Sequence, residues 1–516
     1  MKKRYVITAA VTAALMAAGA VGGTIAYFTS ENKANMSIEA GVVRMSLEAS
    51  NLKLYSLDVE QQNGQFQNGG LATLQEATVA LEKMTPGDRV EFDLTLNNQS
   101  NVLAKYQLLY SFQNEQSGKE ASQGDLDYAT AKLSSGLVIS MKDAQGQAAP
   151  AAMTNIGPGE EMPAYHVSVE LPVEAGNEYQ GAKSNVEFKL YGVQANMEVE
   201  AAVMSYSQLI DAIAADTSVE LLGDIEIPAT DSIVLPAGAH IIGNGHKIIA
   251  EGRSTAVNPF IFKLGGDNVV IEGIEVEASD ASTYAVLVPF THGFTLKDCE
   301  FHGADANGNT SAYLVYNYGQ PRIAQNIVFD GVVVDGYWAN LYGGNINLDD
   351  EHNIIVKNSM IMTEWYTLNT HCKDLIVEDS VIRGWTTFNN SGTAKFTNVT
   401  FSASEYGDVD SKLNYIRCYS PAEFTNCKFL ENGDHEEGDG KGLLLEVINN
   451  TTAKLTNCKV ARQNALSTFI DIVADDPTTF DFVTLKMHST GSPNGAGIYV
   501  NDSELLTGEN TPSLVW

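Results

Sequence analysis

An eight-residue pattern recurs in the second half of the chain and constrains the fold more than any other feature. Position three and position eight are apolar in every copy. Position five holds only residue types that tolerate left-handed φ at a bend and can stack on the same position one coil away. The eight copies begin at Val269, Phe294, Ile327, Ile354, Leu375, Ala394, Ala422 and Ala453. Their fifth positions are Gly273, Asp298, Gly331, Asn358, Asp379, Asn398, Asn426 and Asn457.

The spacing between copies varies while the pattern stays the same. Successive copies start 25, 33, 27, 21, 19, 28 and 31 residues apart, so loop lengths differ and strands do not. Such a solenoid, with a repeat of roughly 25 residues and three short strands per turn, indicates a right-handed parallel β-helix. We predict about nine coils within residues 201–516. The capping box from Ser205 to Gln208 predicts a short helix that caps its N-terminal end.

Residues 27–200 show a different, period-two pattern. Pro86-Gly87 and Pro158-Gly159 supply turns between the alternating runs. Short alternating strands joined by turns favour an antiparallel β-sandwich, so the whole chain is predicted to be all-β. The apolar members of the three clearest runs are Val90, Phe92, Leu94 and Leu96, then Tyr106, Leu108, Tyr110 and Phe112, then Tyr165, Val167, Val169 and Leu171.

The N-terminus has the features of a secretory signal peptide. Lys2, Lys3 and Arg4 precede the apolar run VITAAVTAALMAAGAVGGTIA, which ends in small residues. We predict that residues 1–26 are removed; the alternative is a retained N-terminal anchor helix. No second apolar run is long enough to cross a bilayer, so no membrane span is expected after processing.

Four segments of the first 200 residues carry a family resemblance. They are GGTIAYFTS, ANMSIEAGVVRMSLEAS, MTPGD at Met84 to Asp88, and LPVEAGNEYQGAKSNVEFKLYGVQAN. In this order they resemble the TasA and camelysin family of secreted matrix-fibre proteins of Gram-positive bacteria. The resemblance implies a jelly-roll-like sandwich and a dedicated signal peptidase that cuts between Ala26 and Tyr27. It also implies a location at the cell surface or in the extracellular matrix.

The same resemblance implies a way to assemble. In that family, the freed N-terminal segment adds as a strand to the next subunit, so the partners would be copies of this chain or related subunits. The apolar side chains available for such strand donation are Tyr27, Phe28, Met36 and Ile38. The alternative is that this segment folds onto its own domain as an edge strand. Both interpretations stay open, because this chain carries a large extra domain.

The second domain resembles the pectate-lyase-like β-helix superfamily. GNGHKI at Gly243 to Ile248 and the asparagine-cysteine turns carry this resemblance. The superfamily includes lyases, hydrolases, adhesins and non-catalytic repeats, so the resemblance implies a fold and no particular chemistry.

Three tryptophans suggest a ligand platform on the β-helix. Trp338, Trp365 and Trp385 follow the fifth position of three consecutive copies by seven, seven and six residues. We predict that stacked coils bring them into one column, with Tyr366 beside it, and that sugar rings pack on these aromatic faces. The alternative is an internal aromatic stack.

Catalytic residues are harder to assign. Acid/base hydrolysis of a glycan needs two carboxylates about 5 to 9.5 Å apart, and Asp349, Asp350 and Glu364 are candidates on adjacent coils. Arg383 is a candidate to neutralise a uronate. The alternative is that these are ordinary turn and surface charges. The paired-aspartate pattern of polygalacturonases and the arginine cluster of pectate lyases are missing.

An acidic loop is a candidate calcium site. NGDHEEGDGK offers four hard oxygen ligands, Asp434, Glu436, Glu437 and Asp439. The alternative is a solvated loop, and no other cofactor is expected.

Five cysteines divide into two groups. Cys299, Cys427 and Cys458 all occupy position six of the repeat and are predicted to fill the core as small apolar side chains. Cys372 and Cys418 lie outside the pattern. The odd total favours reduced thiols, and a disulfide between Cys372 and Cys418 is the alternative.

The charge balance removes one function class. The chain has 64 acidic and 31 basic residues, a net charge of -33. Binding to nucleic acid requires clustered Lys and Arg, so that class is excluded.

Together these features predict a secreted surface or matrix protein. A TasA-like module would assemble it, and the β-helix would contact extracellular glycans as an adhesin. One alternative is a secreted polysaccharide lyase or glycoside hydrolase that uses the sandwich for attachment. Another is a purely structural fibre component.

Overall fold

The computed structural model divides the chain into two compact units, Met1–Met197 and Glu198–Trp516. None of the helices in the described residues is long and apolar enough to cross a membrane. The described residues are 42–118, 131–179, 181–214, 216–250, 260–277, 284–287, 293–302, 314–316, 326–335, 340–341, 353–370, 372–402, 414–431, 443–447, 451–462, 483–487, 497–501 and 513–515.

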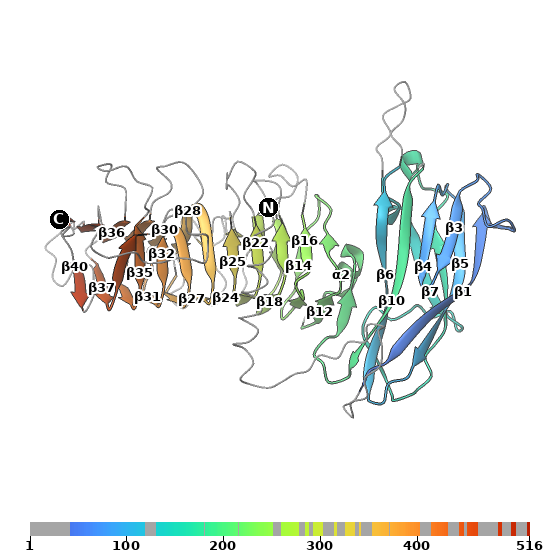
Figure 1. The fold of residues 1–516 in the computed structure, drawn as a ribbon, viewed down its shortest axis with the longest axis horizontal. Coiled ribbons are helices and arrows are strands. Elements are labelled where there is room, and N and C mark those ends of the chain that lie inside the picture. Colours follow the sequence, from blue (N-terminus) through green and yellow to red (C-terminus); the bar gives the residue numbers. More distant parts are fainter. Residues whose placement is uncertain are drawn as a thin grey trace, which may run out of the picture. The chain divides into compact units, whose positions relative to one another are not determined.

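The first unit contains two five-stranded antiparallel sheets (Figure 1). One sheet has the order β2 (Val59–Gln61), β1 (Met45–Ser56), β5 (Asp88–Asn98), β9 (Tyr165–Glu170) and β7 (Val138–Asp143). The other has the order β3 (Leu71–Gln75), β4 (Thr78–Glu82), β10 (Lys183–Gln194), β6 (Ala104–Gln116) and β8 (Thr154–Ile156). Two short 3-10 helices, Leu133–Ser135 and Asn177–Tyr179, lie in the connections.

Alternation in β5 explains why these two sheets pack face to face. Val90, Phe92 and Leu94 are at most 1% exposed and belong to a single core that also includes β10 residues. The ring of Phe92 meets the ring of Phe188 on β10 edge-on, with 5.3 Å between centroids. The predicted antiparallel sandwich is confirmed.

The MTPGD segment forms a hydrogen-bonded turn at the start of β5. Asp88 is buried, and its carboxylate accepts hydrogen bonds from the Thr85 backbone N–H at 2.7 Å and from the Ser56 hydroxyl at 2.6 Å. Gly87 has φ +90°, a left-handed value that favours glycine. The aspartate therefore stabilises the turn and has a structural role.

The second unit is built from three sheets whose strands all pair in parallel (Figure 1). The twelve-stranded sheet contains β11 (Ala201–Val203), β12 (Ser218–Leu221), β15 (His240–Ile242), β18 (Val269–Glu272), β21 (Phe294–Lys297), β24 (Ile327–Asp330), β27 (Asn353–Lys357), β29 (Asp374–Glu378), β31 (Ala394–Thr397), β34 (Ala422–Thr425), β37 (Thr452–Thr456) and β40 (Gly497–Asn501). The four-stranded sheet contains β14 (Ile233–Leu235), β17 (Phe260–Leu264), β20 (Tyr284–Leu287) and β23 (Val315–Tyr316).

The third sheet of this unit has fifteen strands. They are β13 (Ile225–Glu226), β16 (Lys247–Ile249), β19 (Glu275–Glu277), β22 (Glu300–His302), β25 (Val333–Asp335), β26 (Asn340–Leu341), β28 (Met360–Thr370), β30 (Val381–Phe388), β32 (Thr400–Ser402), β33 (Asn414–Cys418), β35 (Lys428–Glu431), β36 (Leu443–Val447), β38 (Lys459–Arg462), β39 (Val483–Met487) and β41 (Ser513–Val515).

Parallel stacking of successive coils confirms the predicted β-helix. The predicted capping helix is α2 (Tyr206–Ala212), whose N-cap Ser205 accepts a hydrogen bond from the Gln208 backbone N–H. Each coil contributes one strand to the twelve-stranded sheet, so the sheet has more strands than the nine coils expected from the repeat. The estimate was short because β11, β12, β15 and β40 pair in register without carrying the eight-residue pattern.

The apolar positions of the repeat form the core of this unit. All eight residues at position three, and the seven at position eight whose burial the structure describes, are at most 1% exposed. Phenylalanines stack between neighbouring coils: the rings of Phe396 and Phe424 lie 4.8 Å apart and those of Phe401 and Phe429 lie 5.3 Å apart, each pair within 6° of parallel.

Position five behaves as the sequence predicts. All eight residues have positive φ, between 46° and 69°. Asparagine side chains bond along the stack: Asn398 Nδ2 donates to Asp379 Oδ1 at 2.8 Å, Asn426 Nδ2 to Asn398 Oδ1 at 3.2 Å, and Asn457 Nδ2 to Asn426 Oδ1 at 2.7 Å. We call these four residues the asparagine ladder.

All five cysteines are buried and free, as predicted. The three at position six donate to backbone carbonyls, for example Cys299 Sγ to Ile271 O at 3.3 Å. Burial raises the pKa of the Cys299 thiol and of the Cys372 thiol to about 12. The thiols therefore stay protonated and act as core side chains.

Ion pairs link neighbouring coils on the outer face of the twelve-stranded sheet. Glu272 contacts His240 on the preceding coil at 3.2 Å (Oε2 to Nε2) and Lys297 on the next coil at 2.6 Å (Oε1 to Nζ). Lys357 and Asp330 form a similar pair at 3.0 Å. Opposite charges on directly adjacent strands stabilise this pairing.

We expect Glu272 to make the stability of the β-helix depend on acid pH. Its contacts with His240 and then with Lys297 lower its pKa from 4.5 to about 2. A carboxyl whose pKa is lower in the folded state stabilises the fold above its unfolded pKa. That contribution is lost as the pH falls from about 4.5 to about 2.

Thermal melts between pH 2 and pH 6 test this expectation. Glu272→Gln should flatten the decline in melting temperature over that pH window. Glu423→Gln, which removes an exposed carboxylate from β34, is the matched control and should leave the wild-type decline unchanged. Equal slopes for all three proteins would contradict the role of Glu272.

Candidate functional site

Only part of the predicted site lies within the described residues. Trp385 is in β30, and Glu364, Trp365 and Tyr366 are in the backbone of β28. The other predicted functional positions lie outside the described residues: Trp338, Asp349 and Asp350 on the β-helix, the acidic loop with Asp434, Glu436, Glu437 and Asp439, and the N-terminal residues Ala26, Tyr27, Phe28, Met36 and Ile38.

The predicted column of tryptophans is wrong for Trp365 and Trp385, the two members that lie in described strands. On β28 the backbone partner of Trp385 is Tyr366 rather than Trp365. Register shifts occur between Met362 and Tyr366 and again between Tyr366 and Leu368. Regular register from the Met362–Arg383 pair would place Glu364 opposite Trp385, and the first irregularity moves the pairing by two residues, to Tyr366.

A different set of side chains gathers around Trp385. Trp385 on β30 and Tyr415 on β33 lie on adjacent strands, and their rings meet edge-on with 5.1 Å between centroids. The guanidinium of Arg417 lies 4.4 Å from the centroid of Tyr415 and 5.7 Å from that of Trp385. Glu446 on β36 lies 3.3 Å from Arg417 (Oε2 to Nε). We call these four residues the aromatic patch.

Strand alternation explains why these side chains point away from the core. Phe388, Ile416 and Leu445 on the same three strands are buried in the core of the unit. Residues at odd offsets from them therefore face outward. Trp385 and Arg417 are half-buried, whereas Tyr415 and Glu446 are 7% and 8% exposed. The patch thus has two layers. Trp385 and Arg417 are partly accessible to solvent, and the hydrogen-bonded pair Tyr415 and Glu446 lies buried beneath them.

Hydrogen bonding sets the protonation of Tyr415. Its hydroxyl donates to Glu446 Oε2. Burial, and then the contact with Glu446, raise the pKa of Tyr415 to about 12. The phenol therefore stays neutral at physiological pH and holds the Glu446 carboxylate in place beside Arg417.

A polar column runs beside the aromatic residues. Backbone register places Asn369, Thr387, Arg417 and Glu446 on successive strands β28, β30, β33 and β36. The Thr387 hydroxyl oxygen is shielded from solvent and has no hydrogen-bond partner among the residues that the structure describes. Its oxygen is therefore not available to a ligand, and Asn369 and Arg417 are the other partly exposed polar side chains of the column.

Arg383 does not match its predicted role as a solvated charge or an exposed uronate contact. It is 1% exposed, the largest fully buried side chain among the described residues. Its carbonyl accepts a hydrogen bond from the Thr367 hydroxyl at 2.6 Å. Its side chain is covered by other residues, so it offers no exposed charge to a uronate.

Sequence reasoning missed Tyr415, Arg417 and Glu446. These residues lie on β33 and β36, whose ladder is separate from the eight-residue pattern. The alternation in NYIRC, with Tyr415 and Arg417 on one face and Ile416 and Cys418 on the other, was the available signal. The sequence does not show how the segment between β30 and β33 folds, so it could not predict that Tyr415 and Arg417 lie beside Trp385.

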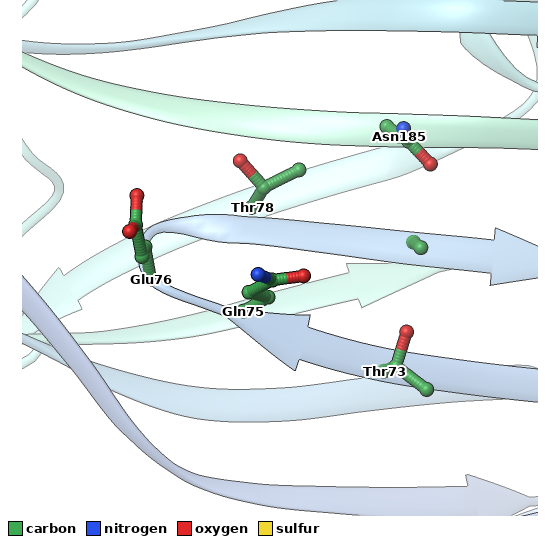
Figure 2. A pocket seen from close by; sticks show the side chains of 6 residues that line it. Thr73, Gln75, Glu76, Thr78 and Asn185 are labelled. Carbon is green, nitrogen blue, oxygen red and sulfur yellow. The ribbon is translucent and has the colours of Figure 1, made fainter.

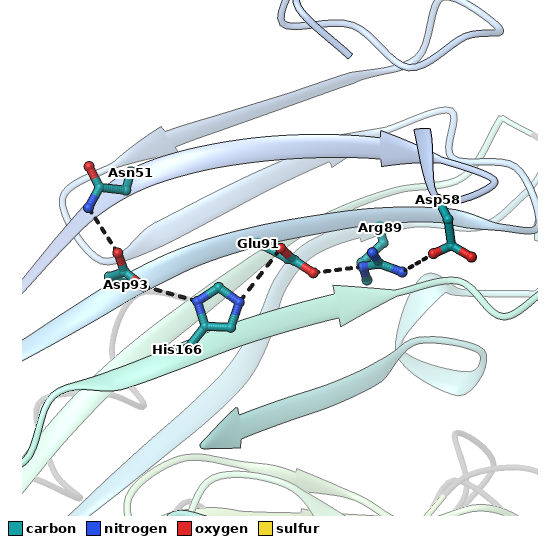
Figure 3. Close-up of polar contacts among 6 residues, drawn as sticks. All are labelled: Asn51, Asp58, Arg89, Glu91, Asp93 and His166. Carbon is teal, nitrogen blue, oxygen red and sulfur yellow. Dashed lines mark hydrogen bonds and ion pairs between the residues drawn. The ribbon is translucent and has the colours of Figure 1, made fainter. Parts of the chain in front are cut away.

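The sandwich has two polar features of its own. One is a hollow of about 290 Å³ lined by Thr73, Gln75, Glu76, Thr78, Ala80 and Asn185. Figure 2 shows the side chains that line it. It contains no aromatic platform. Figure 3 shows a polar network on the outer face of β1, β5 and β9, in which His166 lies 3.0 Å from Asp93 (Nδ1 to Oδ1) and 3.6 Å from Glu91 (Nε2 to Oε2).

That network extends through Arg89, which pairs with Glu91 at 3.0 Å and with Asp58 at 2.8 Å. Within the described part of the chain, no group of three or more His, Cys, Asp or Glu side chains is arranged to hold a metal ion. The network is therefore best described as surface ion pairing.

Comparison with known proteins adds little. No family model matches the chain, and no curated protein matches it either. Among solved structures, it is similar to the catalytic domain of a GH87 alpha-1,3-glucanase. A substituted form in complex with tetrasaccharides has 10% identity and a TM-score of 0.27, over 90% of this chain and 89% of that one. The complex with nigerose has 10% identity and a TM-score of 0.22, over 92% and 98%. Both scores are too low to inform the function of this chain.

Proposed function

We propose that the protein is a secreted surface or matrix protein whose β-helix binds glycans through the aromatic patch. The observation that carries this proposal is the juxtaposition of Trp385, Tyr415 and Arg417 on adjacent outward-facing strands. Sugar rings have apolar faces that pack on aromatic rings and hydroxyls that bond to charged and polar side chains. The polar column beside the rings supplies such groups.

An enzymatic role is not favoured by this patch. Glycoside hydrolysis by acid/base chemistry uses two carboxylates. The patch contains one, Glu446, and it is buried, paired with Arg417 and bonded to Tyr415. We therefore propose binding without turnover.

Replacing Trp385 with alanine tests glycan binding. We expect affinity for the bound glycan to fall about tenfold or more, roughly 1.4 kcal/mol, because the most accessible stacking ring is lost. A glycan array identifies the ligand, calorimetry measures the change, and analysis of released sugars in the same samples tests turnover.

Tyr55→Ala is the matched control for that experiment. Tyr55 lies on the sandwich, with the guanidinium of Arg89 4.8 Å from its ring centroid. The control thus removes an arginine-contacting aromatic residue outside the patch and should leave binding unchanged. An unchanged affinity for Trp385→Ala, or no binding of wild-type protein to any glycan, would contradict the proposal.

We further propose TasA-like assembly through the N-terminal segment. The supporting features are the sequence resemblance and the four edge strands of the sandwich, β2, β7, β3 and β8. An added strand could bond to the main chain of such an edge. Deleting residues 27–38 should abolish fibres while the circular dichroism and melting of the protein stay unchanged. Fibres of normal appearance by electron microscopy would refute strand donation.

A further inference from the structure

We infer that the aromatic patch selects uncharged glycans over polyuronates, an inference that rests on the glycan-binding function proposed above. Arg417 is the cation of the patch, and Glu446 already balances its charge at 3.3 Å. Glu446 is also fixed by the Tyr415 hydroxyl and is buried. The charges of the four residues of the patch therefore sum to zero.

The geometry of Arg417 weakens recognition of a carboxylate. Two-pronged binding of a uronate needs a guanidinium whose charge is not already compensated. Here its Nε edge faces Glu446, and the guanidinium lies against the rings of Tyr415 and Trp385. Coulomb energy falls only as the inverse of distance, so the buried Glu446 offsets part of the attraction that Arg417 exerts on an incoming carboxylate.

Neutral hydrogen-bonding groups complete the patch. Asn369 is partly exposed and lies in register with Thr387, which is in turn in register with Arg417. An asparagine side chain both donates and accepts. A sugar hydroxyl also does both, whereas a carboxylate only accepts. Hydroxyl groups on an uncharged sugar therefore match this column better.

The charge of the whole chain acts in the same direction. With a net charge of -33, the protein repels polyanions before they reach the patch. Salt screens this repulsion over about 8 Å at physiological ionic strength. Binding of a polyuronate should therefore strengthen as salt rises, the reverse of binding driven by a cation.

Glu446→Gln tests the inference directly. Glutamine retains the size of the side chain and an oxygen that accepts from Tyr415, and it leaves the charge of Arg417 uncompensated. We expect the ratio of the affinity for polygalacturonate to the affinity for a neutral glucan to rise about tenfold over the wild-type ratio. Glu423→Gln, an exposed carboxylate on β34, controls for the general change in charge.

A second measurement uses wild-type protein and so does not depend on the variant folding. The protein is titrated with a neutral glucan and with polygalacturonate, each in low and in high salt. Tighter binding of polygalacturonate than of any neutral glycan, still lost in Trp385→Ala, would overturn the inference and leave glycan binding intact. Unchanged selectivity in a folded Glu446→Gln protein would also overturn it. Failure of wild-type protein to bind either class would instead refute the proposed function.

Discussion

Replacing Phe424 with alanine is expected to lower the free energy of unfolding of the β-helix by about 3–5 kcal/mol. Phe424 is fully buried, and its ring stacks on Phe396 of the preceding coil at 4.8 Å. It also meets Phe401 and Phe429 edge-on at 5.9 and 5.6 Å. Alanine would leave a cavity that neighbouring strands, fixed by their ladder hydrogen bonds, cannot close.

Urea unfolding followed by circular dichroism measures this loss. Phe424→Leu is the matched control, because it retains most of the apolar volume and should cost less than half as much. Each coil of a solenoid contacts only its neighbours, so the variant should unfold first around β31, β34 and β37. Equal costs for alanine and leucine would show that the stacked rings contribute no more than a single aliphatic side chain.

The repeat predicted the interior of the β-helix better than its surface. Position three and position eight must face the core in every coil, so Phe396 and Phe424 could be placed from the pattern alone. The bend at position five requires positive φ, which glycine, asparagine and aspartate tolerate. Each of these requirements is local, so it can be identified within a single copy of the repeat.

The aromatic patch could not be predicted in the same way. Its members come from strands that follow turns of different lengths, and their register depends on irregularities in β28. In regular register Trp385 would pair with Glu364, and the irregularity places Tyr366 there instead, so counting along the chain could not identify the partner of Trp385. Arg383 likewise alternates as an outward residue after Ile382, yet it is buried. Alternation predicts direction and says nothing about what covers a side chain.

The asparagine ladder supplies the second large effect. Asn426 accepts a hydrogen bond from Asn457 and donates one to Asn398, and its own φ is 55°. Asn426→Ala should lower the free energy of unfolding by about 2 kcal/mol. It removes both side-chain hydrogen bonds, and alanine tolerates left-handed φ less well than asparagine does. Urea unfolding measures the change.

Asn426→Gly separates these two causes, because glycine adopts positive φ without strain and lacks the side-chain bonds. We expect glycine to cost about 1 kcal/mol, from the lost hydrogen bonds alone. If alanine and glycine cost the same, the ladder would act through its hydrogen bonds and the bend would carry no strain. If Asn426→Gly leaves the free energy of unfolding unchanged, asparagine would be needed at position five only for its tolerance of left-handed φ. The stacked side chains would then follow from the fold and would not stabilise it.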